Sequence, residues 1–507
     1  MKKMNLDDIT KYIEEDNKSS LELFNGLSEI LDESYAIFPK ENNLIGIFFI
    51  DLLKLYSSTY LKLKEIDYAL VPKEIITSRL RSWPYVGYQQ LADFKKYNYD
   101  YFGKDTSINF GKKSYDKKTL YINFFRMLKI SSKHKKNISI AGQSALTTKK
   151  HLDVLLGRSH LSSIKVTHPW FYVKNCDDQI SYFRKHLADL LIKYFNEELA
   201  LELTNLSLKH IIGSININDE EKSIGIDHLQ DSEFLILGSG LELHNRMIAS
   251  EAMSRDIPII NVMHGAAFGV NDEPIFGSYG EQMYSSKILG YGKGILKHAK
   301  SYNFITNHEA DYIPSNADNI SKIFKGKQVS NPSKKDLQYY YFPTSLRGTE
   351  HRYGPFADLP DYLYLEWQRI LNQIFEGNLK TKTHPKEKYA FLYDYVDSKI
   401  VSGSFLEVED SVDIFIFDYV STIFHEACAT RKPVVFFDLG IRNINDKAME
   451  AIKKRTIYYD LRKTTVPSYA EINERIFEER KENELTETYS LNDKKILRSE
   501  SLIDALY

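Results

Sequence analysis

The sequence has little cysteine, almost no net charge and no long apolar run. Its two cysteines, Cys176 and Cys428, are too few and too far apart for a disulfide framework or a zinc site, and they fit a reducing compartment. The 67 Lys and Arg residues against 69 Asp and Glu residues give a formal charge of −2, so the composition does not favour a nucleic-acid binder. The Lys-rich segments 112–118 and 129–136 are interpreted as solvated surface, with contact to an anionic membrane face or a charged glycan as the weaker alternative.

The sequence also lacks the features of an exported or membrane-spanning chain. Its start becomes acidic at Asp7, where a signal peptide would become apolar. The most apolar run, Leu44–Ile50, is ended by Asp51 and is shorter than the roughly 20 residues that span a bilayer. We therefore expect a cytoplasmic protein, with peripheral contact at the inner face of the membrane left open.

The length of 507 residues indicates more than one domain, since a single core stops growing at roughly 250–300 residues. Residues 1–130 are predicted to be mainly helical, and residues 481–507 to form a helical tail. Between them, residues 131–325 and 331–480 each alternate buried apolar strands with helices, which is typical of a parallel sheet covered by helices. The expected fold class is α/β, with two Rossmann-like domains facing a cleft and an N-terminal helical extension.

The predicted elements define where ligands would bind, because loops after parallel strands form the sites of such sheets. The expected strands are 137–142 and 233–240, each ending in a turn, and 258–263 in the first unit, and 337–343, 378–382, 399–401, 412–417 and 433–437 in the second. The expected helices are 179–203, 243–254, 362–375 and 422–430.

One candidate group follows the strand at 378–382. His384 and Pro385 fall in the loop after it, and Pro385 favours an extended backbone at His384. A histidine pointing into the cleft can donate a hydrogen bond to a phosphate. The alternative is a helix that begins with proline in its first turn and an incidental histidine.

A second candidate group follows the apolar strand at 412–417. Ser421 and Thr422 are placed at the start of the next helix, where backbone N–H groups, hydroxyls and the helix dipole favour a phosphate. Glu426 lies one turn further, on the same face as Thr422, and can accept a hydrogen bond from a ribose. The alternative is that Ser421 is only an N-cap and Glu426 a solvated helix residue.

A third group, in the loop after the strand at 337–343, contains Thr344, Ser345 and Arg347. These side chains suit a phosphate or a sugar, and an ordinary surface loop is an equally weighted alternative.

Together, the His-Pro pair, the apolar strand, the Asp-Tyr-x-Ser-Thr sequence and the helix with Glu426 resemble a known pattern. The pattern is similar to the C-terminal donor domain of bacterial polysialyltransferases, Kdo transferases of capsule synthesis and CDP-glycerol glycerophosphotransferases. The resemblance covers roughly the last third of the chain. It implies a GT-B glycosyltransferase in which His384 contacts the donor phosphate and Ser421 and Thr422 hold it. Residues 331–480 would then bind the nucleotide sugar and residues 131–325 the acceptor.

The first unit contains a loop that resembles the His-Gly loop of several surface-carbohydrate transferases, including a group of O-antigen transferases. His264 and Gly265 leave an apolar strand into a run of small residues. A transferase needs a base or a nucleophile beside the acceptor hydroxyl. The candidates in and after this loop are His264, Asp272, Glu273 and Glu281. The acidic Asp/Glu-Asp-Gly motif that carries the polysialyltransferase base has no clean copy in the sequence.

Other motifs point to no different chemistry. Residues 238–240, Gly-Ser-Gly, are interpreted as a tight strand-to-helix turn in preference to a phosphate loop. The sequence shows no Walker A motif, nucleophile elbow, metal-spaced His/Cys set or Asp-x-Asp motif, so we predict neither a cofactor nor metal dependence.

The expected function is transfer of a sugar from a nucleotide donor to a bacterial surface glycan or a lipid-linked glycan. The resemblance favours a cytidine-based donor, such as a CMP-activated 2-keto acid sugar of the Kdo or nonulosonate type. Two alternatives are a non-hydrolysing nucleotide-sugar epimerase and a non-catalytic subunit of a polysaccharide assembly complex.

Overall fold

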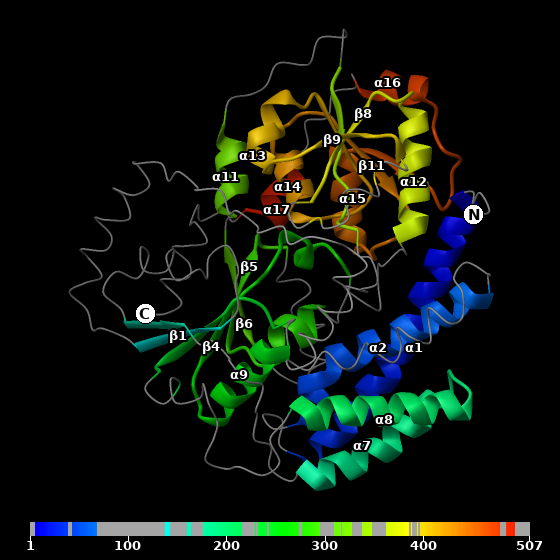
Figure 1. Cartoon of the computed structure of the whole chain (residues 1–507). Helices are drawn as coiled ribbons and strands as arrows, with labels where there is room; N and C mark the ends of the chain where they lie inside the picture. The colour runs from blue at the N-terminus through cyan, green and yellow to red at the C-terminus, as the bar shows by residue number, and fades with distance from the viewer. Residues whose placement is uncertain are drawn as a thin grey trace.

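The structure is a computed structural model of the whole chain (Figure 1). It describes residues 6–38, 43–67, 137–141, 160–163, 176–214, 229, 232–240, 243–272, 276–294, 309–315, 317–326, 337–346, 361–384, 387, 393, 396–476 and 483–491.

The second half of the chain forms a six-stranded parallel sheet with the order β12-β11-β10-β7-β8-β9. Counted from its own first strand, this order is 6-5-4-1-2-3, which is the Rossmann order. The strands are β7 (Tyr339–Tyr341), β8 (Leu379–Lys382), β9 (Lys399–Val401), β10 (Ile414–Phe417), β11 (Val434–Asp438) and β12 (Ile457–Asp460). The accompanying helices are α12 (Asp361–Ile374), α13 (Phe405–Val408), η6 (Glu409–Ser411), α14 (Thr422–Ala429), α15 (Asp446–Arg455), α16 (Tyr469–Ile476) and α17 (Glu484–Tyr489).

Strand β10 shows why this sheet is covered on both faces. Its four residues are all apolar and all buried, which is typical of a central parallel strand. Ile414 and Ile416 pack on the face covered by α12, whereas Phe415 and Phe417 pack on the face covered by α13 and α14. The alternation follows from the two-residue period of a strand.

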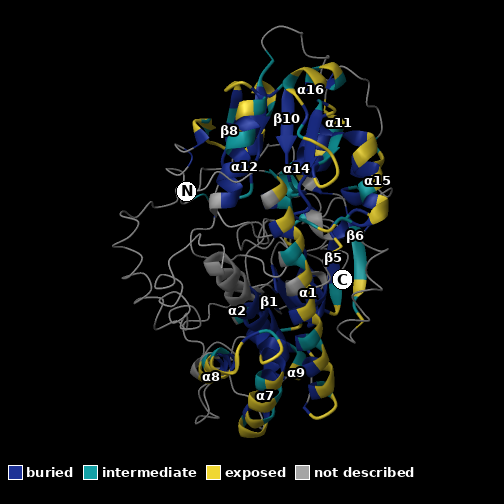
Figure 2. Cartoon of the chain, turned by 90° about the vertical axis from the view of Figure 1, so that its right-hand side faces the viewer, coloured by how far each residue is buried: buried dark blue, intermediate teal, exposed yellow. Residues whose placement is uncertain are grey.

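Helix α12 is held to the sheet by one apolar stripe. Leu363, Trp367 and Leu371 recur every four residues and are completely buried, as the spacing of a helix face requires. Burial of each large apolar side chain contributes about 1.5–3 kcal/mol, so this stripe accounts for the position of the helix. In Figure 2 the buried inner faces of the helices surround the buried strands.

The first domain contains a second parallel sheet with the order β2-β1-β3-β4-β5-β6. Its strands are β1 (Asn137–Ala141), β2 (His160–Ser163), β3 (Phe234–Leu237), β4 (Ile259–Val262), β5 (Lys287–Tyr291) and β6 (Asp311–Ser315). The helices described between and after them are α7 (Cys176–Leu191), α8 (Glu197–Ser214), α9 (Leu243–Ser254), the 3-10 helix η3 (Ala266–Gly269), the π-helix η4 (Phe276–Gln282) and α11 (Asp318–Lys325).

The N-terminal helices α1 (Leu6–Tyr35) and α2 (Leu44–Asp67) pack on this framework. Helix α1 is shared by both domains: its first turns contribute Ile9 and Ile13 to the core of the second domain, and its later turns contribute Leu23 and Leu27 to the core of the first. Figure 1 shows α1 running from beside α12 to the helices α7 and α8. One helix therefore packs into the cores of both α/β units.

The C-terminal part of the described chain also belongs to the cores. The sequence predicted a helical tail over residues 481–507, and α17 is a helix within that range. Ile472 of α16 and Leu485 and Tyr489 of α17 are buried against the second domain. Helix α17 reaches the first domain too, because the N–H of Gly294 donates to the carbonyl of Thr488.

The predicted fold class, α/β with two Rossmann-like domains, is confirmed by the two parallel sheets. Helix α9 and strand β9 have the predicted bounds. The helix expected over 179–203 is two helices, α7 and α8, separated at residues 192–196. The proposed domain limits stay a prediction.

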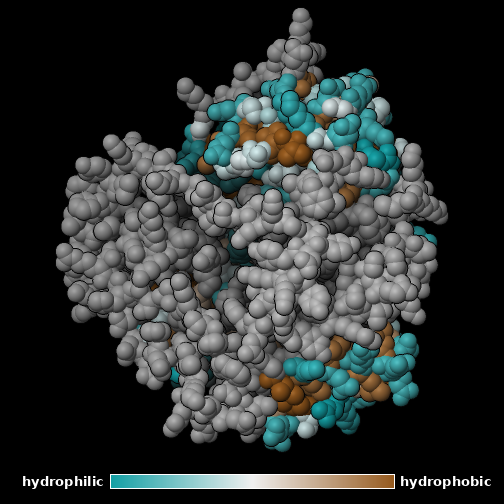
Figure 3. All heavy atoms as spheres, viewed as in Figure 1, coloured by the Kyte–Doolittle hydropathy of each residue, from teal (hydrophilic) through white to brown (hydrophobic). Residues whose placement is uncertain are grey.

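The described surface carries few large apolar side chains. Those exposed are Leu21, Ile37, Ile192, Leu201, Ile212, Ile400 and Leu406. In Figure 3 hydrophobic residues show in two places, in the upper part of the molecule and at its lower end, where α7 and α8 lie. Within the residues that the structure describes, no helix combines the length and the hydrophobicity needed to cross a membrane.

Candidate functional site

The order of the second sheet locates a ligand site before any side chain is considered. The strand order reverses between β7 and β10, and ligands of such sheets bind outside the carboxyl ends of the strands at this switch point. The loops after β7 and β10 therefore border the expected site. They contain two of the groups that the sequence predicted, Thr344–Ser345 and Ser421–Thr422.

A buried carboxylate, Asp418, ties these two loops together. It follows β10 directly and accepts hydrogen bonds from the hydroxyl of Tyr341, the hydroxyl of Tyr364 at 3.2 Å and Nε1 of Trp367 at 3.0 Å. The hydroxyl of Tyr364 in turn accepts from the backbone N–H of Thr344 at 3.0 Å. The start of the β7 loop is thus connected to the start of the β10 loop through side chains of β7 and α12.

Asp418 has an unusual protonation equilibrium. Burial away from water raises the pKa of its carboxyl from 3.8 to about 6, and the hydrogen bonds from Tyr341, Trp367 and Tyr364 partly oppose this rise. The hydrogen bonds stabilise the ionised form, so at neutral pH Asp418 is a charged acceptor shared by three donors. Its position beneath the loop makes it a positioning residue.

Ser421 and Thr422 begin helix α14, as the sequence predicted. Ser421 is the N-cap, and its Oγ accepts from the backbone N–H of Phe424 at 3.3 Å. Capping uses the hydroxyl oxygen as an acceptor, which leaves the hydroxyl able to donate to a ligand. Both side chains are half-buried, while Glu426 one turn later is 8% exposed. The helix N-terminus, with its partial positive charge, lies at the carboxyl edge of the sheet.

The predicted loop of the first domain meets this helix start. The backbone N–H of Ala266 donates to Oγ1 of Thr422 at 3.3 Å, and a Cβ on Gly265 would lie 3.3 Å from the same oxygen. His264, just before, is exposed. The structure therefore brings together the His264–Gly265 and Ser421–Thr422 groups, which are more than 150 residues apart in the sequence.

A short antiparallel contact fixes the domains next to this meeting point. Asn271 bridges Ile444, and the N–H of Asp272 donates to the carbonyl of Asn443 at 2.6 Å. Asn445 caps α15 through its Oδ1, and its Nδ2 donates to the carbonyl of Val270 at 2.6 Å. The side chain of Asp272 is exposed at this boundary.

The loops after β7 and β8 are also joined. Leu346 donates its backbone N–H to Oε2 of Glu387 at 2.8 Å, and the N–H of Glu387 donates to the carbonyl of His384 at 2.9 Å. His384 is half-buried and Ser345 is 5% exposed. The predicted candidates Arg347, Pro385 and Glu273 lie outside the described residues.

Glu281, the remaining candidate base, is placed differently from His264 and Asp272. It belongs to the π-helix η4 and is 2% exposed. Its backbone carbonyl accepts from Nδ2 of Asn261 at 2.6 Å and from Oγ of Ser285 at 2.5 Å. Glu281 is therefore held inside the first domain, whereas His264 and Asp272 are exposed at the domain boundary.

Two residues of the site were missed as functional candidates from the sequence. In the sequence, Asp418 is the first residue of the Asp-Tyr-x-Ser-Thr pattern and Lys382 is the last residue of a predicted strand. Lys382 is 2% exposed at the carboxyl end of β8. The signal that could have identified it is a lysine in the inward register of a strand, where apolar residues are the norm.

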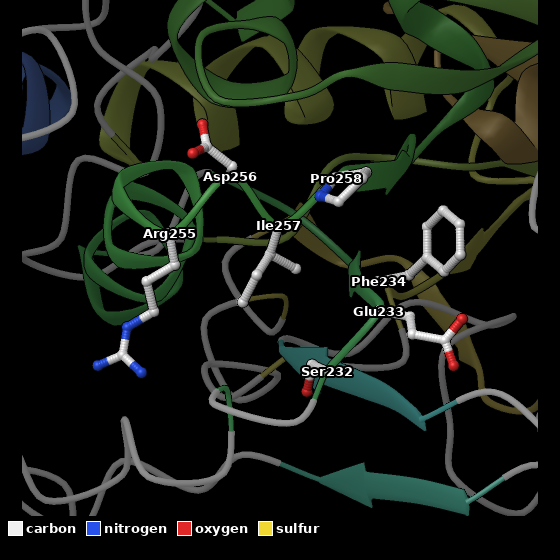
Figure 4. Close-up of a pocket in the computed structure, with 7 residues that line it drawn as sticks. All are labelled: Ser232, Glu233, Phe234, Arg255, Asp256, Ile257 and Pro258. Carbon is white, nitrogen blue, oxygen red and sulfur yellow. The ribbon is translucent and has the colours of Figure 1, made fainter.

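The pocket shown in Figure 4 is not at this edge. It has a volume of about 580 Å³ and opens at the amino-terminal ends of β3 and β4. It is lined by Ser232, Glu233, Phe234, Arg255, Asp256, Ile257 and Pro258. Since ligands of parallel α/β sheets bind at the carboxyl ends, the switch point of the second sheet is the better candidate. Across the described part of the chain, no three His, Cys, Asp or Glu side chains gather as metal ligands.

No protein-family model matches the chain, and no curated protein matches it in sequence. Among solved structures it is similar to the UDP-GlcNAc 2-epimerase from Methanocaldococcus jannaschii, with 10% identity over 74% of this chain and 99% of that chain, and a TM-score of 0.36. It is also similar to the glycosyltransferase SnogD from Streptomyces nogalater, with 8% identity over 75% of this chain and 94% of that chain, and a TM-score of 0.32.

Proposed function

We propose that the protein is a GT-B glycosyltransferase that binds a nucleotide-activated sugar at the carboxyl edge of its second sheet. The observation that carries the proposal is the meeting of the first-domain loop at Gly265–Ala266 with the start of α14 at Thr422, beside the switch point between β7 and β10. A donor held at the switch point would lie between the two domains, where an acceptor bound to the first domain could reach it.

The proposed donor site uses groups that favour a phosphate. Ser421 supplies a hydroxyl at the start of α14, and the helix dipole favours negative charge there. His384 follows β8 on the same edge and would contact the phosphate, with Thr344 and Ser345 bordering the sugar or the nucleotide. Glu426 and Thr422 lie further along α14, and Glu426 would accept a hydrogen bond from the ribose.

The finer assignment is a cytidine-based donor, such as a CMP-activated 2-keto acid sugar, and a surface or lipid-linked glycan as acceptor. Its support is the order of the His-Pro and Ser-Thr groups in the sequence. The base would come from the first domain, where the exposed His264 directly precedes the residues that contact α14 and the exposed Asp272 lies at the domain boundary, where its N–H donates to Asn443. Such a group would remove the proton from the acceptor hydroxyl as the bond to the nucleotide phosphate breaks. The proposed reaction uses no cofactor and no metal.

Nucleotide binding gives the direct test. We expect one of CMP, CDP, UDP and GDP to stabilise the protein in a thermal-shift titration, because a ligand that binds only the folded state raises its stability by mass action. The double variant Ser421→Ala, His384→Ala should weaken that binding about 100-fold, since two hydrogen bonds to a charged phosphate are lost. Isothermal titration calorimetry measures the dissociation constants.

The matched control changes the same residue types away from the edge. Ser254 ends α9 at the opposite edge of the first sheet, and His186 stacks on Tyr182 in α7. The variant Ser254→Ala, His186→Ala should bind the nucleotide as the wild type does. Equal affinity in both double variants would show that the nucleotide binds elsewhere. Conversion of a nucleotide sugar to its epimer without any acceptor would contradict transfer and indicate an epimerase.

A further inference from the structure

Lys382 is a buried ammonium group that makes one hydrogen bond within the part of the chain that the structure describes. It is 2% exposed, and its Nζ donates to the carbonyl of Thr383 at 2.6 Å. An ammonium group has three N–H donors, so this bond uses one of them. Within the described residues, Lys382 forms no salt bridge. Glu407, the carboxylate that attracts it, is exposed and accepts at 2.5 Å from the backbone N–H of Ser404 in a capping box.

Burying an ammonium group without an ionic partner costs free energy, because the charge loses its contact with water. A buried charge is normally paired, and desolvation disfavours the charged form when it is not. Burial accordingly lowers the pKa of Lys382 below its usual value. Lys380, two residues earlier, shows the ordinary arrangement: its Nζ donates to Oε1 of Gln338 at 2.6 Å and lies 5.1 Å from the centre of the Tyr340 ring.

The strand register places Lys382 on the face of the sheet that carries α13 and α14. Residues of a strand alternate between faces, so Lys380 and Lys382 share one face. Lys380 lies over Tyr340, which packs in the same core as Phe405 of α13 and Phe424 of α14. Both helices begin at the carboxyl edge of the sheet. The buried ammonium therefore lies on the same face and at the same edge as the N-terminus of α14.

We propose that Lys382 binds the phosphate of the nucleotide donor, together with Ser421 and the N-terminus of α14. The proposal rests on the proposed function in that the anion is taken to be part of a nucleotide. Strand β7 separates β8 from β10, so the two strand ends lie roughly 10 Å apart. A lysine side chain and a phosphate group together span this distance. The phosphate would supply the acceptors that the ammonium lacks, in charge-assisted hydrogen bonds.

The test is the variant Lys382→Met, which keeps the length of the side chain and removes its charge. We expect its dissociation constant for the nucleotide that the wild type binds best to rise about tenfold or more. Its affinity for the matching nucleoside, which has no phosphate, should stay unchanged. Without ligand, the variant should be at least as stable as the wild type, since it no longer buries a poorly paired charge.

The control is Lys380→Met, because Lys380 lies on the same strand and face with its own partners; its nucleotide affinity should equal that of the wild type. Lys382→Arg keeps the charge and should bind more tightly than Lys382→Met. A purely structural role predicts the reverse pattern: Lys382→Met would be less stable than the wild type or unable to fold, and Lys382→Arg would bind the nucleotide no better than Lys382→Met. Unchanged nucleotide affinity in Lys382→Met would overturn the proposal.

Inorganic pyrophosphate separates this proposal from the proposed function. We expect pyrophosphate to stabilise the wild type against heat and to have no such effect on Lys382→Met. If this difference is found although no nucleotide binds, the anion site stands and the glycosyltransferase assignment fails. If nucleotides bind and depend on Ser421 and His384 but not on Lys382, the function stands and the role of Lys382 is wrong. Absence of any pyrophosphate effect on the wild type would also count against the site.

Discussion

Replacing Asp418 with alanine should lower the free energy of unfolding by about 3–5 kcal/mol at neutral pH. The carboxylate is 2% exposed and accepts from Tyr341, Tyr364 and Trp367. Alanine leaves these buried donors without their shared acceptor, and each unsatisfied donor costs about 1–3 kcal/mol. Urea denaturation followed by circular dichroism measures the loss. The variant Asp413→Ala is the control, because Asp413 precedes the same strand and accepts one bond from Gln338 at 2.8 Å; its loss should be about 1 kcal/mol.

The pH dependence provides a second measurement on Asp418. Its pKa is raised from 3.8 to about 6 in the folded protein, so the folded state holds the proton more tightly than the unfolded state does. The stabilisation from that proton is complete below about pH 4 and is lost as the pH rises through about 6. Asp418→Asn keeps one oxygen acceptor and has no proton to lose, so this contribution should be absent from its stability profile between pH 4 and pH 6. An identical profile in the two proteins would show that Asp418 does not titrate as proposed.

The variant Asp418→Ala should also weaken ligand binding, because Asp418 helps to hold the loop after β7. Tyr364 accepts from the N–H of Thr344 and donates to Asp418, so removal of Asp418 releases the hydroxyl that holds this loop. We therefore expect Asp418→Ala to weaken nucleotide binding even at temperatures where it remains folded. Weaker nucleotide binding by the folded Asp418→Ala variant would distinguish a positioning role of Asp418 from a contribution to stability alone.

Strong local patterns made much of the fold predictable. The run Ile414–Phe417 is apolar throughout, and the helix at 243–254 has the expected bounds in the structure. The strand β12 and the helix α15 were missed. Residues 457–460 include two tyrosines and an aspartate, and a sheet-edge strand with half-buried residues lacks the continuous apolar signal. The burial of α17 depends on contacts with Gly292 and Gly294, which no local pattern encodes.

For the candidate site, the sequence could predict which residues follow strands but not their partners. Ser421 was correctly placed as the start of a helix because hydroxyl residues cap helices after apolar strands. The contact of Thr422 with Ala266 depends on how two domains pack, and neither segment contains that information. The role of Asp418 depends on Tyr364 and Trp367, which lie more than 50 residues earlier in the chain. That Lys382 is buried with one hydrogen bond among the described residues follows from its three-dimensional surroundings and not from the local sequence.

The Gly-Ser-Gly turn of the first domain leads to the second large expected effect. Replacing Gly240 with alanine should lower the free energy of unfolding by about 3 kcal/mol or more. A Cβ at this position would lie 2.0 Å from the carbonyl oxygen of Gly280 in η4, which is a backbone atom and cannot move away as a side chain can. The turn itself is fixed as well, since Arg246 donates to the carbonyl of Gly240 and Asn245 to that of Ser239.

The suitable control is Gly377→Ala. Gly377 has a positive φ of 77° and no atom within 4 Å of an added Cβ, so alanine there meets only the backbone cost of about 1–2 kcal/mol. A larger loss of stability in Gly240→Ala than in Gly377→Ala, measured by thermal unfolding, would show that close packing against η4 requires a glycine at position 240. A loop that binds phosphate would behave differently: stability would change little and nucleotide affinity would fall. If both variants lost the same stability and only Gly240→Ala lost nucleotide affinity, the donor phosphate would be assigned to the first domain. The expected result, a loss of stability alone, leaves the switch point of the second sheet as the donor site.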